Sequence, residues 1–139
     1  GIFPIPNFAI HDSNRPVYIE DCDSGKLVFN PDCCVVSEPP QLFEYRPGLD
    51  AETNPVLVVE VLSKSTYEYD FAEKLPCYKK IPSLRQIIFI DSRRVYVTIF
   101  NRLDDNGQWL NADFDKLESK FEISGKPVIL KEIYSHLAK

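Results

Sequence analysis

The 139-residue sequence contains no methionine, only two histidines and no glycine-rich run. Because even an initiator methionine is missing, we expect either a trimmed N-terminus before Gly1 or methionines in modified form. His11 and His136 are isolated, and the four cysteines form no C-x-x-C pair, so the spacing does not support a zinc site.

Long hydrophobic runs are also absent. No stretch approaches the length of a membrane helix, and no signal peptide is visible. Cys33 and Cys34 lie in an apolar run and are expected to be ordinary buried thiols. No cysteine spacing demands a disulfide, which favours a reducing cytoplasm.

Positive charge is in deficit as well. Sixteen lysines and arginines stand against 21 acidic residues, for a net charge of -5. This balance gives no general attraction to nucleic acid, so any DNA-directed role must come from a local basic feature. The length suits one domain with a sizeable core, and there are no internal repeats or low-complexity segments.

The hydrophobic pattern predicts a mixed α/β fold with a central sheet. We expect residues 1–16 to be irregular or an edge segment, with no helix before residue 17. The predicted strands are 17–20, 26–29, 32–37, 56–62, 85–92, 94–102 and 109–112, with a short apolar patch at 121–123 and a polar loop at 41–54. The predicted helices are 66–80, covering one face of the sheet, and Leu130–Leu137. Ser65 and Glu68 resemble a capping box, whereas Pro76 predicts a kink.

Glu60 stands inside the apolar run `VLVVEV`, where a carboxylate is costly. From Glu60 to Ser63 the strand advances about 10 Å. The predicted helix then returns about 12 Å between Thr66 and Lys74, which brings Lys74 back level with Glu60. Lys74 falls within the apolar arc of the helix, and Asp70 precedes it by four residues, a favourable spacing for an ion pair.

Asp32 supplies a second acid at the start of another strand. If the two strands are neighbours, Asp32 and Glu60 converge, and carboxylates 4 Å apart repel by about 4 kcal/mol at an effective dielectric near 20. A hard cation such as Mg²⁺ between them would relieve this repulsion. Plainer interpretations remain: Asp32 as a turn former, Glu60 in a structural pair with a lysine, and Lys74 merely neutralising Asp70.

Other charged residues are less specific. Lys64 is a competing lysine, expected to be solvated in the strand-to-helix turn. Asp91 ends a strand and is interpreted as a turn residue. Arg93, Arg94 and Arg102 with Lys79 and Lys80 form either a basic DNA-facing surface or scattered solvated charges.

Four segments, `NPDCCVV`, `NPVLVVEVLSKST`, `YDFAEKLPCYKKIPSLRQIIFID` and `LKEIY`, resemble the Uma2 family. Its members are described as restriction-endonuclease-like proteins, numerous in bacteria and especially in cyanobacteria. The resemblance runs from about residue 30 to residue 134 and is most specific over 55–91. It implies the PD-(D/E)xK nuclease superfamily, with a mixed sheet flanked by helices, and one restriction-endonuclease-like domain over residues 1–139.

The resemblance also implies site residues. Asp32, after Pro31, matches the first acid of the superfamily pattern, Glu60 matches the second, and Val61 would offer its backbone carbonyl to the metal.

The lysine expected two positions after Glu60 is replaced by Leu62. In this family Lys74 takes its place on the following helix, and Asp70 matches an acid on the same helix. A glutamate from a helix before the sheet has no counterpart here, so that helical element is expected to be missing.

The sequence therefore predicts a Mg²⁺- or Mn²⁺-dependent endonuclease acting on DNA, expected to be a homodimer because cutting both strands favours two sites, with no association with membranes. Asp32 and Glu60 would hold the metal and Lys74 would activate water. The alternative is an inactive member of the fold that serves as a binding or interaction module.

Overall fold

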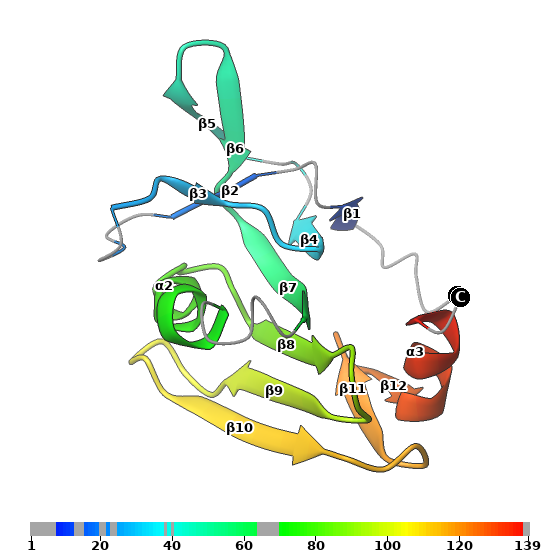
Figure 1. Ribbon diagram of the computed structural model, residues 1–139. Coiled ribbons are helices and arrows are strands. Elements are labelled where there is room, and N and C mark those ends of the chain that lie inside the picture. The colour runs from blue at the N-terminus through cyan, green and yellow to red at the C-terminus, as the bar shows by residue number, and fades with distance from the viewer. Residues whose placement is uncertain are drawn as a thin grey trace.

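The computed structural model describes residues 8–12, 16–19, 22, 25–37, 39, 41–63 and 70–137. Figure 1 shows the arrangement of its elements. The strands are β1 (Phe8–Asp12), β2 (Val17–Tyr18), β3 (Val28–Phe29), β4 (Cys33–Ser37), β5 (Leu42–Arg46), β6 (Leu49–Glu52), β7 (Pro55–Leu62), β8 (Gln86–Asp91), β9 (Val97–Arg102), β10 (Trp109–Phe114), β11 (Lys120–Ile123) and β12 (Lys126–Ile129). The helices are η1 (Asp70–Lys74), α2 (Leu75–Lys79) and α3 (Leu130–Leu137).

Six strands form the main sheet in the order β1-β4-β7-β8-β9-β10. Only β7 and β8 run parallel within it, and the chain segment that connects them carries η1 and α2. A parallel pair needs such a crossover connection, which accounts for the helix between these two strands. A four-stranded sheet (β3-β2-β6-β5) and the β11–β12 hairpin complete the fold.

Both faces of the main sheet are covered, which explains why β7 is apolar almost throughout. Val58 and Phe89 point to one face and pack with Tyr78 of α2. Leu57 and Ile88 point to the other face, where the hydrophobic cluster includes Leu130 of α3 and Phe121 of β11. Figure 1 shows α2 on the left of the view and α3 on the right, next to β12. None of the helices in the described part of the chain is long and apolar enough to span a bilayer.

The mixed α/β class, the strands of the main sheet and the terminal helix Leu130–Leu137 are confirmed. Residues 8–12 form an edge strand against β4, in agreement with the edge segment predicted there. The apolar patch at 121–123 proves to be one strand of the β11–β12 hairpin.

The polar loop predicted at 41–54 is wrong, because these residues form the β5–β6 hairpin that projects at the top of Figure 1. The missed signal is Pro47-Gly48, since proline and then glycine at the two central positions favour a tight turn. Gly48 has a positive φ of 77°, which glycine adopts without strain.

The described part of the predicted helix 66–80 is helical without a gap, but its winding changes along its length. Residues 64–69, with Lys64 and the predicted capping box, lie outside the described residues. The remainder begins as the π-helical turn η1 and continues as α2, with Pro76 in the first turn of α2. Proline lacks an N–H and is tolerated in a first turn, so the change of winding at Lys74 replaces the predicted kink.

Cys22 and Cys77 form a disulfide, although no cysteine spacing in the sequence demands one. The sequence spacing gave no hint of this bond, because the two residues are 55 positions apart and meet only after α2 packs on the sheet. Neither Cys33 nor Cys34 takes part in a disulfide among the described residues; Cys34 is buried as predicted, whereas Cys33 is only half-buried. The cysteines therefore no longer favour a reducing cytoplasm, and that location stays a prediction.

Loss of the disulfide should destabilise the fold. A bond that closes a 55-residue loop stabilises a protein by about 4 kcal/mol through the entropy of the unfolded chain. We expect Cys22→Ser and Cys77→Ser to lower the free energy of unfolding by similar amounts in urea titrations, and Cys33→Ala, at a half-buried cysteine outside this disulfide, to lower it much less. Alkylation of Cys22 in the native, unreduced protein would contradict the pairing.

Candidate active site

Glu60 on β7 is a buried carboxylate at the centre of the candidate site. It is only 2% exposed, and its strand lies between β4 and β8. Because side chains alternate along a strand, Glu60 points to the same face as Val58 and Leu62, which pack with α2. A carboxylate in this position requires hydrogen bonds and opposite charge to offset its loss of water.

Lys74 and Tyr78 provide both. Lys74 Nζ lies 2.7 Å from Glu60 Oε2, and the Tyr78 hydroxyl donates to the same oxygen at 2.9 Å. Their i, i+4 spacing places them on one side of the η1–α2 segment. The Phe29 ring packs edge-on against Tyr78 and lies 5.6 Å from Lys74 Nζ. The ammonium, the phenol and the carboxylate are thus held as one packed unit.

Asp32 lies beside this unit, immediately before β4. Its Oδ2 accepts the Val61 backbone N–H at 2.7 Å, while Glu60 Oε1 accepts the Asp32 N–H in a longer bond of 3.4 Å. Strands β4 and β7 are antiparallel neighbours, with Cys33 opposite Val59. Each acid is therefore held by backbone next to the other, with Asp32 exposed and Glu60 buried behind it.

The oxygens of Asp32 and Glu60 suit a hard divalent cation. Each carboxylate offers two oxygens with about four lone-pair positions between them. Mg²⁺ usually keeps several waters and binds through one or two carboxylates. Across the described residues no group of three or more His, Cys, Asp or Glu side chains could hold a metal. A cation here would therefore rely on two carboxylates, backbone oxygen and water.

Asp70 cannot be added to this set. Its backbone opens η1, but its side chain lies outside the described residues. The structure thus brings Asp32, Glu60, Val61 and Lys74 together, whereas the position of the Asp70 carboxylate stays a prediction.

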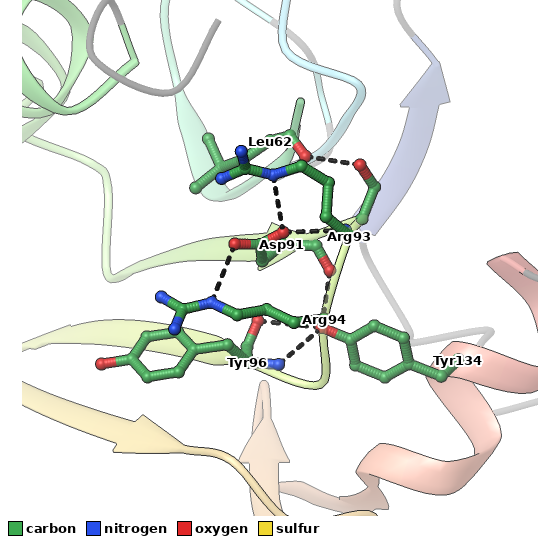
Figure 2. A network of polar contacts seen from close by, with 7 residues as sticks. Leu62, Asp91, Arg93, Arg94, Tyr96 and Tyr134 are labelled. Carbon is green, nitrogen blue, oxygen red and sulfur yellow. Dashed lines mark hydrogen bonds and ion pairs between the residues drawn. The ribbon is translucent and has the colours of Figure 1, made fainter. Parts of the chain in front are cut away.

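Asp91 forms a second buried acidic centre at the end of β8, shown in Figure 2. It is 1% exposed and accepts the Arg93 backbone N–H at 2.8 Å, which confirms its predicted role in the turn. Arg94 Nε lies 3.2 Å from Oδ2, and Arg93 Nε lies 3.5 Å from Oδ1. The Tyr134 hydroxyl of α3 donates to the Asp91 backbone carbonyl. Asp91 therefore holds two arginines as well as the turn.

The basic residues considered from the sequence do not form one surface. Arg102 donates to the backbone carbonyls of Lys79, Ile81 and Leu84, and its guanidinium stacks over the Trp109 ring. Arg102 is therefore a structural residue that ties the end of β9 to the segment after α2. Arg93 and Arg94 stand apart from it on Asp91.

Tyr78 is the residue of the site that sequence reasoning missed. It was included in the apolar arc of the helix, where a tyrosine reads as a core residue. Its i, i+4 relation to Lys74 was the available signal, because any residue at that spacing shares the direction of the lysine.

A cavity of about 750 Å³ lies away from this site. Ile99, Phe114 and Phe121 line it, together with the polar side chains of Gln86 and Asn101. Ile99 and Phe121 belong to the cluster on the opposite face of the sheet from Glu60. The cavity is therefore separate from the carboxylates.

Comparison with known proteins places this arrangement in a family. The model of the Uma2 family, described as "Putative restriction endonuclease", matches residues 7–131. The chain belongs to the Uma2 family. The Synechocystis sp. (strain PCC 6803) protein sll1609 is 30% identical over 117 residues, covering 84% of this chain and 63% of that protein. A second Synechocystis protein, slr1290, is 39% identical over 71 residues, covering 49% and 37% respectively.

A solved structure shares the fold of this Uma2 chain. It is a crystal structure from Anabaena variabilis described as a "putative nuclease belonging to DUF820", with a TM-score of 0.65 and 16% identity. The match covers 94% of this chain and 70% of that one. The mixed sheet flanked by helices is thus a restriction-endonuclease-like core, and the chain spans less than two thirds of the Synechocystis proteins that it matches.

Removal of the Tyr78 hydroxyl should weaken the Uma2 fold at its core. Hydrogen bonds to charged groups contribute about 1.5–3 kcal/mol, and Tyr78→Phe leaves the ring packing on Phe29 in place. We expect a loss of that size in the free energy of unfolding in urea, against less than about 0.5 kcal/mol for Tyr45→Phe on the projecting β5. Equal stability of Tyr78→Phe and the unchanged protein would show that the bond to Glu60 does not contribute.

Acidification should remove the contribution of Asp91. Burial alone would raise the pKa of this carboxyl, but hydrogen bonds from the Arg93 backbone and from the Arg94 and Arg93 side chains hold the pKa below its ordinary value. A lowered pKa contributes stability above the unfolded value, and this is lost as pH falls through the folded value.

We therefore expect the stability difference between the unchanged protein and Asp91→Asn to be largest near neutral pH and to shrink below about pH 4. Urea titrations from neutral pH downwards measure this difference. Asp105→Asn, at an exposed carboxylate, is the matched control, and a pH-independent difference for Asp91→Asn would contradict the assignment.

Proposed function

We propose that this chain is a divalent-metal-dependent nuclease that hydrolyses phosphodiester bonds of DNA. The observation that carries the proposal is that Lys74 Nζ contacts the buried Glu60 carboxylate, while Asp32 is hydrogen-bonded to Glu60 and Val61 on the same strand. Membership in a family described as "Putative restriction endonuclease" supports the same reaction.

In this proposal Asp32 and Glu60, with the backbone carbonyl of Val61, would hold Mg²⁺ or Mn²⁺. Such a cation would lower the pKa of water and stabilise charge on a phosphoryl oxygen. Lys74 maintains the orientation of the Glu60 carboxylate and, as an ammonium, orients the attacking water. The water oxygen bonds to phosphorus as the bond to the leaving oxygen breaks, while the water gives up its proton to solvent and the leaving oxygen takes a proton from solvent. Asp70, on the same helix as Lys74, is assigned to positioning that lysine.

The proposed partner is double-stranded DNA, and a homodimer is proposed because cutting both strands favours two sites. A cytoplasmic location suits such a substrate. The two Synechocystis proteins are longer than the region matched here, so the activity of the complete protein belongs to the same proposal.

A binding module without catalysis is the second candidate, and one observation favours it. Lys74 already provides an opposite charge for Glu60, so the buried acid is neutralised without any cation. A net charge of -5 also gives no general attraction to DNA.

Cleavage of supercoiled plasmid in Mg²⁺ or Mn²⁺ tests the proposal. We expect Asp32→Asn, Glu60→Gln and Lys74→Met each to lower the rate by at least about a hundredfold, in the range that a positioned acid–base group contributes. Lys80→Met, at an exposed lysine just after α2, is the matched control and should retain the rate.

Calorimetric titration of Mn²⁺ separates the two candidates. The nuclease should bind Mn²⁺ stoichiometrically and lose this binding in Asp32→Asn and Glu60→Gln, while Lys74→Met should keep it. A folded protein that neither binds Mn²⁺ nor cleaves DNA is the outcome that supports the binding module.

A further inference from the structure

The arginines on Asp91 lie at the same end and on the same face of the sheet as Glu60. Leu62 of β7 pairs with Asp91 of parallel β8, so the two side chains share a face. Glu60 shares it too, because it precedes Leu62 by two residues. The Ser92 N–H and hydroxyl both donate to the Leu62 carbonyl, at 3.0 and 2.7 Å. The turn that carries Arg93 and Arg94 is thus hydrogen-bonded to β7 at Leu62, about 7 Å along the strand from Glu60.

The turn is also held by hydrogen bonds with Tyr134 of α3. The Tyr134 hydroxyl accepts the Tyr96 N–H and lies within hydrogen-bond distance of the carbonyls of Asp91 and Tyr96, which share its single proton. Figure 2 shows the Tyr134 ring on one side of the turn and the two arginine side chains extending to the other. The Arg94 guanidinium lies 4.5 Å from the centre of the Tyr96 ring, which orients it further. Little side-chain entropy remains to be lost when these arginines meet a ligand.

The chemistry of the pair fits a phosphate group. Arg93 and Arg94 contact Asp91 through Nε, and their side chains remain 47% and 61% exposed. A planar guanidinium can bind phosphate oxygens through two of its nitrogens in a forked arrangement. Two guanidiniums on one carboxylate leave a local charge of about +1, which supplies the local basic feature that an acidic chain needs in order to bind DNA.

We infer that Arg93 and Arg94, positioned by Asp91, bind the phosphate backbone of the nucleic acid next to the bond that the Glu60 site would cut. This inference rests on the proposed nuclease function and adds to it the element that binds the substrate. Asp91 acts as a positioning residue because it reaches the substrate only through the arginines.

Fluorescence anisotropy with a short labelled DNA duplex, without divalent metal and between about 50 and 200 mM salt, tests the inference. The double variant Arg93→Ala/Arg94→Ala should bind more weakly than the unchanged protein. Each phosphate contact adds about 0.9 to the slope of log affinity against log salt, so the slope should fall by about 1.8. Arg85→Ala removes an exposed arginine that lies just before β8 and pairs with Asp105. It should change the slope by less than about 0.9, the contribution of one phosphate contact.

The Asp91→Asn variant distinguishes a role of Asp91 in positioning the arginines from a simple effect of net charge on DNA binding. It makes the protein more positive, so unspecific attraction would tighten binding, whereas loss of the carboxylate that orients both arginines should weaken it. Because Asp91 is buried, thermal unfolding must show a folded variant. Arg94→Lys keeps the charge without the fork and provides a second test at an exposed position, with weakened binding expected there too.

Binding by the double variant with unchanged affinity and slope would overturn the inference, as would the absence of any DNA binding by the unchanged protein. These results are distinguishable from failure of the nuclease proposal. Glu60→Gln should retain DNA binding while losing Mn²⁺ binding and DNA cleavage. The inference about the arginines and the nuclease proposal can therefore be tested separately.

Discussion

The neutralisation of the Glu60 carboxylate is the interaction on which the candidate site depends. A buried carboxylate without partners is strongly destabilising, so the fold must deliver a cation and a hydroxyl to one oxygen. That requires β7 to lie inside the sheet and the η1–α2 segment to return across it. The disulfide at Cys77, next to Tyr78, ties α2 to the chain before β3. Stability and site geometry therefore come from the same contacts.

The parallel pairing of β7 and β8 brings Glu60 and Asp91 to the same edge of the sheet. Parallel strands end at the same edge of a sheet, so Glu60 near the end of β7 and Asp91 at the end of β8 face the same side. One acid is paired with a lysine and the other with two arginines. In the proposed function, the site for hydrolysis and the arginines proposed to bind the phosphate backbone adjoin without any net positive charge on the chain.

Much of this could be predicted because it depends on local geometry. The rise of a strand and of a helix is enough to predict that Lys74 lies level with Glu60. Tyr78 was missed because tyrosine at an apolar helical position usually packs in the core, and its hydroxyl gains a partner only when the sheet is assembled. The β5–β6 hairpin was missed because its residues are polar or exposed and do not alternate clearly.

The sequence by itself determined the mixed α/β class, the burial of β7, the terminal helix and the likeness to the Uma2 family. Apolar periodicity and chain direction encode these features over a few residues at a time. Only the tertiary structure decided that Cys22 meets Cys77, that Glu60 accepts the Asp32 backbone N–H while Asp32 accepts that of Val61, and that Asp91 pairs with two arginines. Such contacts join residues on different elements, and strand order and register, which set their distances, are not carried by any single segment.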